Sequence, residues 1–335
     1  MLVATKERLM TAKKSYYYKG EIIMALDYAK VYQQFIDEEM CASSVTQWMM
    51  PAPGTVKFDG GKDIQLCELS TTGLGTYDAT KTDGSAYPQG AVTNKWRSYS
   101  LFMDRGVKFA LDRTAPSDTG FMATAENVMR EFARTQLARE QDTYRICKIY
   151  NTVVNGAYSA ANSFKGAITK ENAVGELLKT LTAAQNSSEQ LTGFVAIINQ
   201  ELKPAFMEAA NGTFSQITFG EKAEINGIEY ENVMYVNDLV CIFAPKSRMV
   251  TDVSILSGRD DQASGGVTKS ESGKYINFIV SSYDAPLAVS KIDSLKQFPP
   301  EENQLFDGTA IQARYLYDLF VPKAKVCSVA VHAVE

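Results

Sequence analysis

The stretch that decides the fold is 70–120, STTGLGTYDATKTDGSAYPQGAVTNKWRSYSLFMDRGVKFALDRTAPSDTG. Polar and apolar residues alternate over 96–102 and again over 107–112, which is the period of a β-strand. The preceding part, 70–94, is rich in turn-forming residues and has no period. Short strands are expected before it, at 56–58 and 64–66. The pattern therefore predicts two long strands joined by an irregular loop of about 25 residues, a length that is unusual inside a compact domain.

A hairpin of this size cannot bury its apolar face on its own chain. A strand rises ~3.3 Å per residue, so arms of roughly 20 residues project about 60 Å. We therefore expect the hairpin to pack on another subunit. The candidate inter-subunit contacts are Gly73, Tyr77, Lys81, Tyr87, Pro88 and Trp96. The GLG at 73–75 lacks the spacing and strand-to-helix context of a phosphate-binding loop, so we expect it to serve as a hinge or tight turn.

A long helix is predicted from Thr119 to Tyr150. Candidate capping residues stand at 116–119, and charge pairs such as Glu126 with Arg130 fit its outer side. Apolar residues recur at helical spacing at Phe121, Ala125, Val128, Phe132, Tyr144 and Cys147. About 30 residues at 1.5 Å each give a helix of ~45 Å, longer than most globular helices. We expect this helix to act as a spine on which sheets are mounted.

The remaining segments alternate between helix and strand. An amphipathic helix is expected at 22–36, before the Pro and Gly residues of 51–54. Residues 160–300 read as mixed α/β, with helices at 173–184 and 202–210, strands at 194–198 and 238–244, a hairpin turn at 226–227 and a surface loop at 258–273. Two closing strands are expected, within 310–321 and 326–334.

Composition places the chain among ordinary soluble proteins of two or three domains. It has 335 residues, of which 45% are hydrophobic and 22% are charged. The sequence contains no run of 18 apolar residues, so no membrane span is predicted. The N-terminus has no signal-peptide pattern, and we therefore expect the protein to reside in a reducing cytoplasm. The net charge is -5, and 160–322 contains 13 lysine and arginine residues against 20 aspartate and glutamate residues. Such an acidic region is a poor surface for nucleic acid.

The sequence contains few of the residue patterns on which catalytic sites usually depend. His332 is the only histidine, and we expect it to lie within the last strand or just past it, as a packed or exposed residue rather than a ligand or base. The five cysteines, at 41, 67, 147, 241 and 327, form no CxxC motif and no disulfide framework. Adjacent carboxylates at 260–261 and 301–302 are expected to be solvated. We therefore predict no catalytic, metal-binding or cofactor-binding site and no enzymatic activity.

The order of these features resembles a known family. The run 70–120, the helix MATAENVMREFARTQLAREQDTYRICKIY at 122–150 and the ending IQARYLYDLFVPKAKVCSVAVHAV at 311–334 are together similar to the major capsid proteins of tailed phages with the Hong Kong 97 fold. The likeness runs from about residue 20 to the C-terminus and rests on the ordered set of elements rather than on one motif.

The resemblance implies an α+β fold in five parts. These are an N-terminal arm (1–54), an extended hairpin loop (55–114), a peripheral domain with the spine helix (115–160), an axial α/β domain (161–305) and return strands to the peripheral domain (306–335). It further implies hexamers and pentamers that close an icosahedral shell around double-stranded DNA, which the protein would contact non-specifically. The expected location is the virion capsid, after assembly in the host cytoplasm.

The resemblance also implies partner proteins, and it leaves alternative functions open. Because Met1 and only about 20 residues precede the first amphipathic helix, we expect a separate scaffolding protein, with a portal, a possible decoration protein and no membrane. Some relatives form a lysine–asparagine crosslink, for which Lys62 and Lys81 are candidates, although ordinary exposed lysines are the simpler interpretation. An encapsulin-like nanocompartment and another virion component, such as a tail protein, remain the alternative functions.

Overall fold

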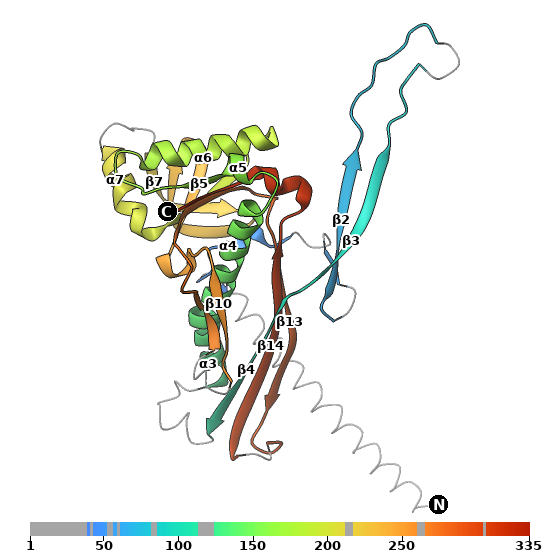
Figure 1. Cartoon of the computed structure of the whole chain (residues 1–335). Coiled ribbons are helices and arrows are strands. Elements are labelled where there is room, and N and C mark those ends of the chain that lie inside the picture. Colours follow the sequence, from blue (N-terminus) through green and yellow to red (C-terminus); the bar gives the residue numbers. More distant parts are fainter. Residues whose placement is uncertain are drawn as a thin grey trace, which may run out of the picture.

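A computed structural model describes residues 39–40, 43–51, 56–58, 61–81, 86–112, 124–211, 217–259, 265–303 and 306–335. The amphipathic helix expected at 22–36 and the capping candidates at 116–119 lie outside these residues. The described chain consists of a large sheet covered by helices, a smaller sheet beside a long helix, and a hairpin that projects away from both (Figure 1).

A seven-stranded sheet forms the larger unit. Its strands are β5 (Ser163–Lys165), β6 (Phe194–Asn199), β7 (Ile217–Ile225), β8 (Ile228–Val236), β9 (Leu239–Ala244), β12 (Ile276–Ser282) and β15 (Val329–Ala333). They lie in the order β5-β15-β12-β6-β9-β8-β7. The turn predicted at 226–227 joins β7 to β8, and both of its residues have positive φ, 50° and 81°, as the Asn-Gly pair favours.

Helices α6 (Ala173–Ser188) and α7 (Lys203–Asn211) lie over this sheet (Figure 1). Leu177 of α6 and Phe206 of α7 are fully buried in one core with Phe278 of β12. A second core includes Val195 and Val331 from the sheet and Ile149 from the spine helix. Strands β6 and β12 are buried along their whole length, and β6 accordingly has a nearly unbroken apolar sequence.

The smaller unit is built on an antiparallel sheet of β13 (Leu287–Phe298), β14 (Gly308–Phe320) and β4 (Met103–Asp112), with β14 in the centre. A ribbon of β10 (Val253–Ser257) and β11 (Gly265–Lys269) lies beside it. The prediction of a surface loop over 258–273 is therefore wrong for 265–269. Val267 is buried against the spine-helix core there, so one apolar side chain among polar and glycine neighbours is enough to hold the strand.

The predicted spine helix spans 30 residues. It comprises α3 (Ala125–Phe132), a π-helical turn (Ala133–Leu137) and α4 (Ala138–Val154). Thr124 caps it, since its side chain accepts a hydrogen bond from the backbone N–H of Asn127 at 3.3 Å. The start predicted at Thr119 lies outside the described residues, and the helix ends four residues later than the predicted Tyr150.

The projecting hairpin consists of β2 (Asp63–Thr71) and β3 (Val92–Ser100), with the short β1 (Val56–Phe58) beside the lower part of β2. Figure 1 shows β2 and β3 leaving the rest of the molecule and continuing beyond their ends as two irregular arms. The alternating segment 96–112 is split at Leu101 and Phe102, because β3 pairs with β2 whereas β4 pairs with β14.

Short elements complete the described chain. They are η1 (Gln47–Met49), α5 (Ser159–Asn162), η3 (Gln200–Leu202), η4 (Lys246–Arg248) and η5 (Lys323–Ser328). Of the two closing strands, β14 pairs with β4, whereas β15 joins the seven-stranded sheet between β5 and β12.

Candidate inter-subunit interface

The hairpin exposes side chains that soluble proteins usually bury. Every residue of β3 except Tyr99 is exposed, and Trp96 keeps 42% of its surface accessible. Leu74 near the tip is completely exposed. Several large apolar side chains exposed on one projecting hairpin indicate an interaction surface.

The two arms stay in register beyond the ends of the strands. The Thr72 amide donates to the Ala91 carbonyl at 3.1 Å, and the Asp78 amide donates to the Ala86 carbonyl at 3.0 Å. Gly75 lies so close to Pro88 that a Cβ on Gly75 would come within 2.5 Å of the proline ring. The GLG at 73–75 therefore allows the arms to approach each other closely.

All six candidate contacts, Gly73, Tyr77, Lys81, Tyr87, Pro88 and Trp96, are exposed. The structure brings three of them together near the tip, where the Tyr77 and Tyr87 rings lie 4.8 Å apart and Pro88 faces Gly75. Trp96 lies nearer the root, with the Lys57 ammonium 4.1 Å from its ring centroid. Two groups of candidates thus occupy two positions along one projecting ribbon.

The root of the hairpin is fixed by charge. The Lys62 ammonium lies 2.7 Å from the Asp104 carboxylate, which also receives two hydrogen bonds from the Arg314 guanidinium at 2.7 and 2.8 Å. Hydrogen bonds from Arg314 and Lys62 hold the pKa of the Asp104 carboxyl well below its usual range. Lys62, one of the two crosslink candidates, is therefore engaged within its own subunit.

A second carboxylate, Asp318 of β14, lies beneath the root and is 1% exposed. It accepts a hydrogen bond from the Phe102 backbone amide at 3.1 Å and another from the Tyr144 hydroxyl at 2.9 Å. Lys148 of α4 forms an ion pair with it. Leu101 is buried next to this carboxylate, in a small core with Ile64, Leu66, Val289 and Leu316.

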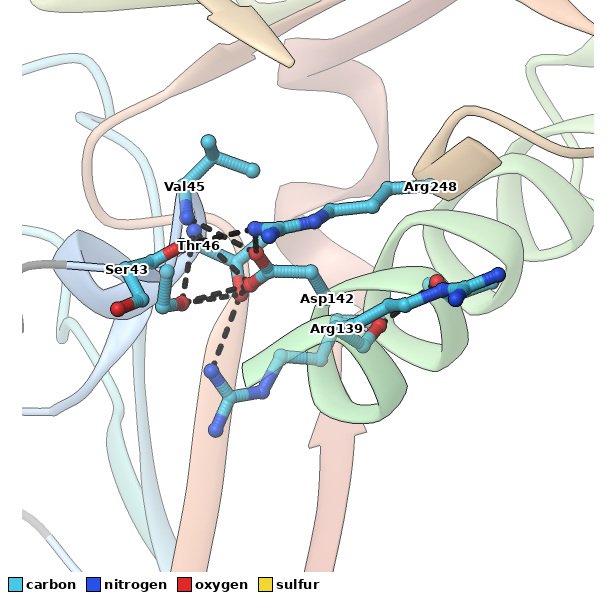
Figure 2. Close-up of polar contacts among 9 residues, drawn as sticks. Ser43, Val45, Thr46, Arg139, Asp142 and Arg248 are labelled. Atoms are coloured by element: carbon cyan, nitrogen blue, oxygen red, sulfur yellow. Dashed lines mark hydrogen bonds and ion pairs between the residues drawn. The ribbon is translucent and has the colours of Figure 1, made fainter. Parts of the chain in front are cut away.

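A third buried carboxylate, Asp142 of α4, connects the spine helix to the segment 43–50 and to η4 (Figure 2). It accepts hydrogen bonds from the Ser44 hydroxyl at 2.6 Å, the Val45 amide at 3.0 Å and the Thr46 side chain. The Arg248 guanidinium lies 2.7 Å away and also donates to the Ser43 carbonyl. Several donors converge on this one side chain, which allows a charge to remain buried.

Arg145 completes the same cluster one helical turn further along. It is fully buried and donates to the Thr46 hydroxyl at 3.0 Å and to the Gln141 side chain at 2.9 Å. Burial lowers the pKa of the Arg145 guanidinium, and the nearby Asp142 charge opposes that effect. The cluster is internal, so we assign it to holding the parts of the subunit together.

His332 lies in β15 as predicted and is 1% exposed. Its Nδ1 atom is 3.0 Å from the Asn277 side-chain nitrogen, and its ring stacks at 4.8 Å from Phe278. Among the described residues, no three His, Cys, Asp or Glu side chains gather as a metal ion requires. No helix in the described part of the chain is long and apolar enough to cross a bilayer.

Sequence patterns missed several residues of this interface and its supports. Phe102 and Phe58 are 70% and 50% exposed at the root of the hairpin. Their apolar character was visible in the sequence, but their exposure depends on which strands pair. Asp318 and Lys148 gave no signal, because an isolated charge in a strand or helix usually faces solvent.

No protein-family model matches the chain, and no curated protein matches it. Several solved structures, however, match most of the chain. The capsid structure of the cyanophage P-SCSP1u is 13% identical, covers 83% of this chain and 85% of its own, and has a TM-score of 0.52. The capsid structure of Staphylococcus phage Andhra is 11% identical, with coverage of 88% and 84% and a TM-score of 0.50.

A virus-like particle from Pyrococcus furiosus is 12% identical, with coverage of 92% and 99% and a TM-score of 0.49. Identities this low establish the fold alone, and the fold assignment rests on phage structures with TM-scores of 0.5 or more, such as the cyanophage and Staphylococcus phage capsids above. The spine helix, the projecting hairpin and the sheet order occur together in this chain. The chain therefore has the Hong Kong 97 fold of tailed-phage capsid proteins, as its sequence predicted.

Proposed function

We propose that this chain is the major capsid protein of a tailed double-stranded DNA bacteriophage and has a structural rather than enzymatic role. Copies would form hexamers and pentamers that close an icosahedral shell around the genome. The observation that carries the proposal is the projecting hairpin, because large apolar side chains of β3 and of the arms beyond the strands stay exposed on the subunit, namely Leu74, Tyr77, Tyr87, Val92 and Trp96. The shared fold supports it, since both phage structures compared above are described as capsids.

The driving force for assembly would be burial of this hairpin surface on a neighbouring subunit. Burial of apolar area contributes ~25 cal/mol per Å², and many modest contacts add up in a closed shell. Gly73, Tyr77, Lys81, Tyr87, Pro88 and Trp96 would lie in this contact. The rest of the hairpin surface, including Leu74 and Val92, would be covered with them.

We further propose the five-part division with boundaries at 54, 114, 160 and 305. Two strands cross it, because β13 lies in the small sheet and β15 lies in the seven-stranded sheet. A separate scaffolding protein would guide assembly, and a portal and a decoration protein would bind the completed shell. Contact with the packaged DNA would be non-specific, because no basic, sequence-reading surface is predicted and the net charge is -5. The location would be the virion capsid, with assembly in the host cytoplasm.

Negative-stain electron microscopy of the purified protein tests the proposal. We expect closed shells, whereas fibres, tubes or small oligomers only would contradict it. The nucleic acid inside particles isolated from a producing cell then separates two kinds of shell. Packaged double-stranded DNA supports a capsid, and enclosed protein cargo without DNA would indicate a nanocompartment instead.

A further inference from the structure

We propose that Asp318 is the residue that positions the hairpin, because it joins the hairpin root to the spine helix. The inference rests on the proposed function insofar as the direction of the hairpin matters for shell assembly. The geometry itself belongs to the single subunit. Asp318 pairs with Val289 of β13, and Phe102 lies one position beyond the last β14–β4 pair, Tyr317 with Met103. Its side chain therefore joins the end of this ladder to the spine helix, which lies outside the sheet.

The two carboxylate oxygens of Asp318 have different partners. Oδ1 accepts from the Tyr144 hydroxyl at 2.9 Å, from the Leu319 amide at 2.7 Å and from the Lys148 ammonium. Oδ2 accepts from the Phe102 amide at 3.1 Å. One oxygen therefore binds the spine helix, and the other binds the two-residue junction at which β3 ends and β4 begins.

This junction is where the direction of the hairpin is decided. Leu101 and Phe102 belong to neither strand, and they separate the exposed β3 from β4, which lies in the small sheet. The Leu101 side chain is buried, and its amide donates to the Lys62 carbonyl at 2.8 Å, which closes the root. The Phe102 amide must find an acceptor because the ladder is interrupted there, and Asp318 supplies it.

The spine side of the connection is equally well defined. Lys148 lies over the Phe320 ring at 5.1 Å from its centroid, and Phe320 contacts Tyr99 of the hairpin at 4.9 Å between centroids. Lys148 is 31% exposed, so it can return to solvent if its partner is removed. A displacement of α4 would therefore reach the hairpin through the Asp318 carboxylate and through the neighbouring aromatic pair.

The substitution Asp318→Asn separates the two sides of this connection. An asparagine oxygen at the Oδ1 position keeps the three donors, and its NH2 group then faces the Phe102 amide. Two donors oppose each other at that point, so the hairpin root loses its acceptor while β14 keeps its contacts. A matched control is Asp63→Asn, since Asp63 accepts from Ser100 within the hairpin itself.

Hydrogen exchange measured by mass spectrometry on the soluble subunit reads out the effect. We expect D318N to speed exchange of amides at 99–103 by about 10-fold or more, as loss of a hydrogen bond to a charged group implies, and to leave 308–317 unchanged. D63N should leave 101–103 at the wild-type rate. Equal exchange rates at 101–103 in D318N and D63N would overturn the inference. Equal acceleration throughout β14 and β4 would also overturn it, because Asp318 would then only stabilise the sheet.

Lys148→Met provides a second, independent variant if D318N does not fold. Lys148 contacts Asp318 and the rings of Tyr144 and Phe320, none of which belongs to the hairpin. We expect faster exchange at 101–103 in K148M, and an unchanged rate there would overturn the inference. Electron microscopy of wild-type protein separates the two proposals. Absence of wild-type shells would refute the capsid function alone, whereas wild-type shells with unaltered exchange in both variants would refute the role of Asp318 alone.

Discussion

The carboxylate of Asp142 and the guanidinium of Arg248 lie 2.7 Å apart, and the aspartate side chain is completely buried. One residue belongs to the spine helix and the other to η4, which follows β9 of the seven-stranded sheet. The same carboxylate binds the backbone at Val45 and Thr46 (Figure 2). Three segments far apart in the sequence are thus held at a single side chain.

Asp142→Ala should therefore destabilise the subunit strongly. It leaves the partly buried Arg248 without its carboxylate and removes the charge near the fully buried Arg145. Breaking a buried ion pair costs about 3–5 kcal/mol. Denaturant unfolding followed by circular dichroism measures the loss. Glu131→Ala is the matched control, because it removes a carboxylate of the same helix whose pair with Arg134 is exposed. A midpoint in D142A equal to that of E131A would contradict the prediction.

Stability should fall on acidification through His332. Burial lowers the pKa of this imidazole from its ordinary value of 6.5, although the nearby Glu176 opposes the effect. The unfolded chain then binds the proton more readily than the folded chain, so the contribution of neutral His332 is complete above pH 6.5 and is lost below it. Asn277 donates to both His332 and the Gly166 carbonyl, which disfavours a second donor on Nδ1.

The variant His332→Gln tests this pH dependence, because glutamine offers an acceptor to Asn277 and does not titrate. Between about pH 8 and about pH 5, wild-type protein should lose more unfolding free energy than H332Q. Carboxylates such as Asp104 and Asp252 do not contribute to the loss of unfolding free energy in this pH range. Hydrogen bonding lowers the pKa of each, so their contributions are lost only at more acidic pH, below about 3.8. Parallel pH profiles for the two proteins would be evidence against the prediction.

Removing the outer hairpin should abolish shells without unfolding the subunit. Thr71 and Val92 are register partners, so 72–91 can be replaced by an Asn-Gly turn. We expect a soluble protein with a normal circular dichroism spectrum that forms no closed particles by electron microscopy. Normal particles from this deletion would refute the role of the hairpin.

A single charge at the tip should have a similar though weaker effect. Leu74 is completely exposed, so Leu74→Asp should leave the thermal midpoint of the subunit unchanged and reduce the yield of shells. Leu191→Asp is the control, since Leu191 is 78% exposed on the seven-stranded unit. Equal losses in both variants would indicate a general effect of the charge rather than a contact at the tip.

Mature particles should run as a single monomer band on a denaturing gel. The Lys62 ammonium lies 2.7 Å from the Asp104 carboxylate of its own subunit, so it is held away from a neighbouring subunit. A ladder of covalent oligomers would contradict this expectation. In that case, Lys62→Ala and Lys81→Ala would identify the lysine that reacts.

The sequence predicted those elements whose periodicity is local. The hairpin, the long helix and the Asn226-Gly227 turn all depend on residues near one another in the chain, and all are present. Pairing between distant segments was not predictable, since nothing in 103–112 indicates that its partner is 308–317. The π-helical turn at 133–137 also has no evident signal in the sequence.

Buried charges were the main omission of the sequence interpretation. Asp142, Arg145 and Asp318 look like solvated residues when read one at a time, because charged side chains are rarely buried. They become recognisable only when donors from other elements converge on them. The exposed residues of the hairpin loop could be predicted from the sequence. The stretch 70–94 has no periodicity and is rich in glycine and tyrosine, which is not the pattern of a strand in a core.

The spine helix has a consequence for how the subunit unfolds. Met129, Ala133 and Tyr144 are buried with the three-stranded sheet, whereas Ile149 and Val153 further along are buried with the seven-stranded sheet. One continuous helix therefore supplies side chains to two separate cores. Neither core can lose this helix without exposing the other, so the subunit should melt in a single cooperative transition despite its two sheets.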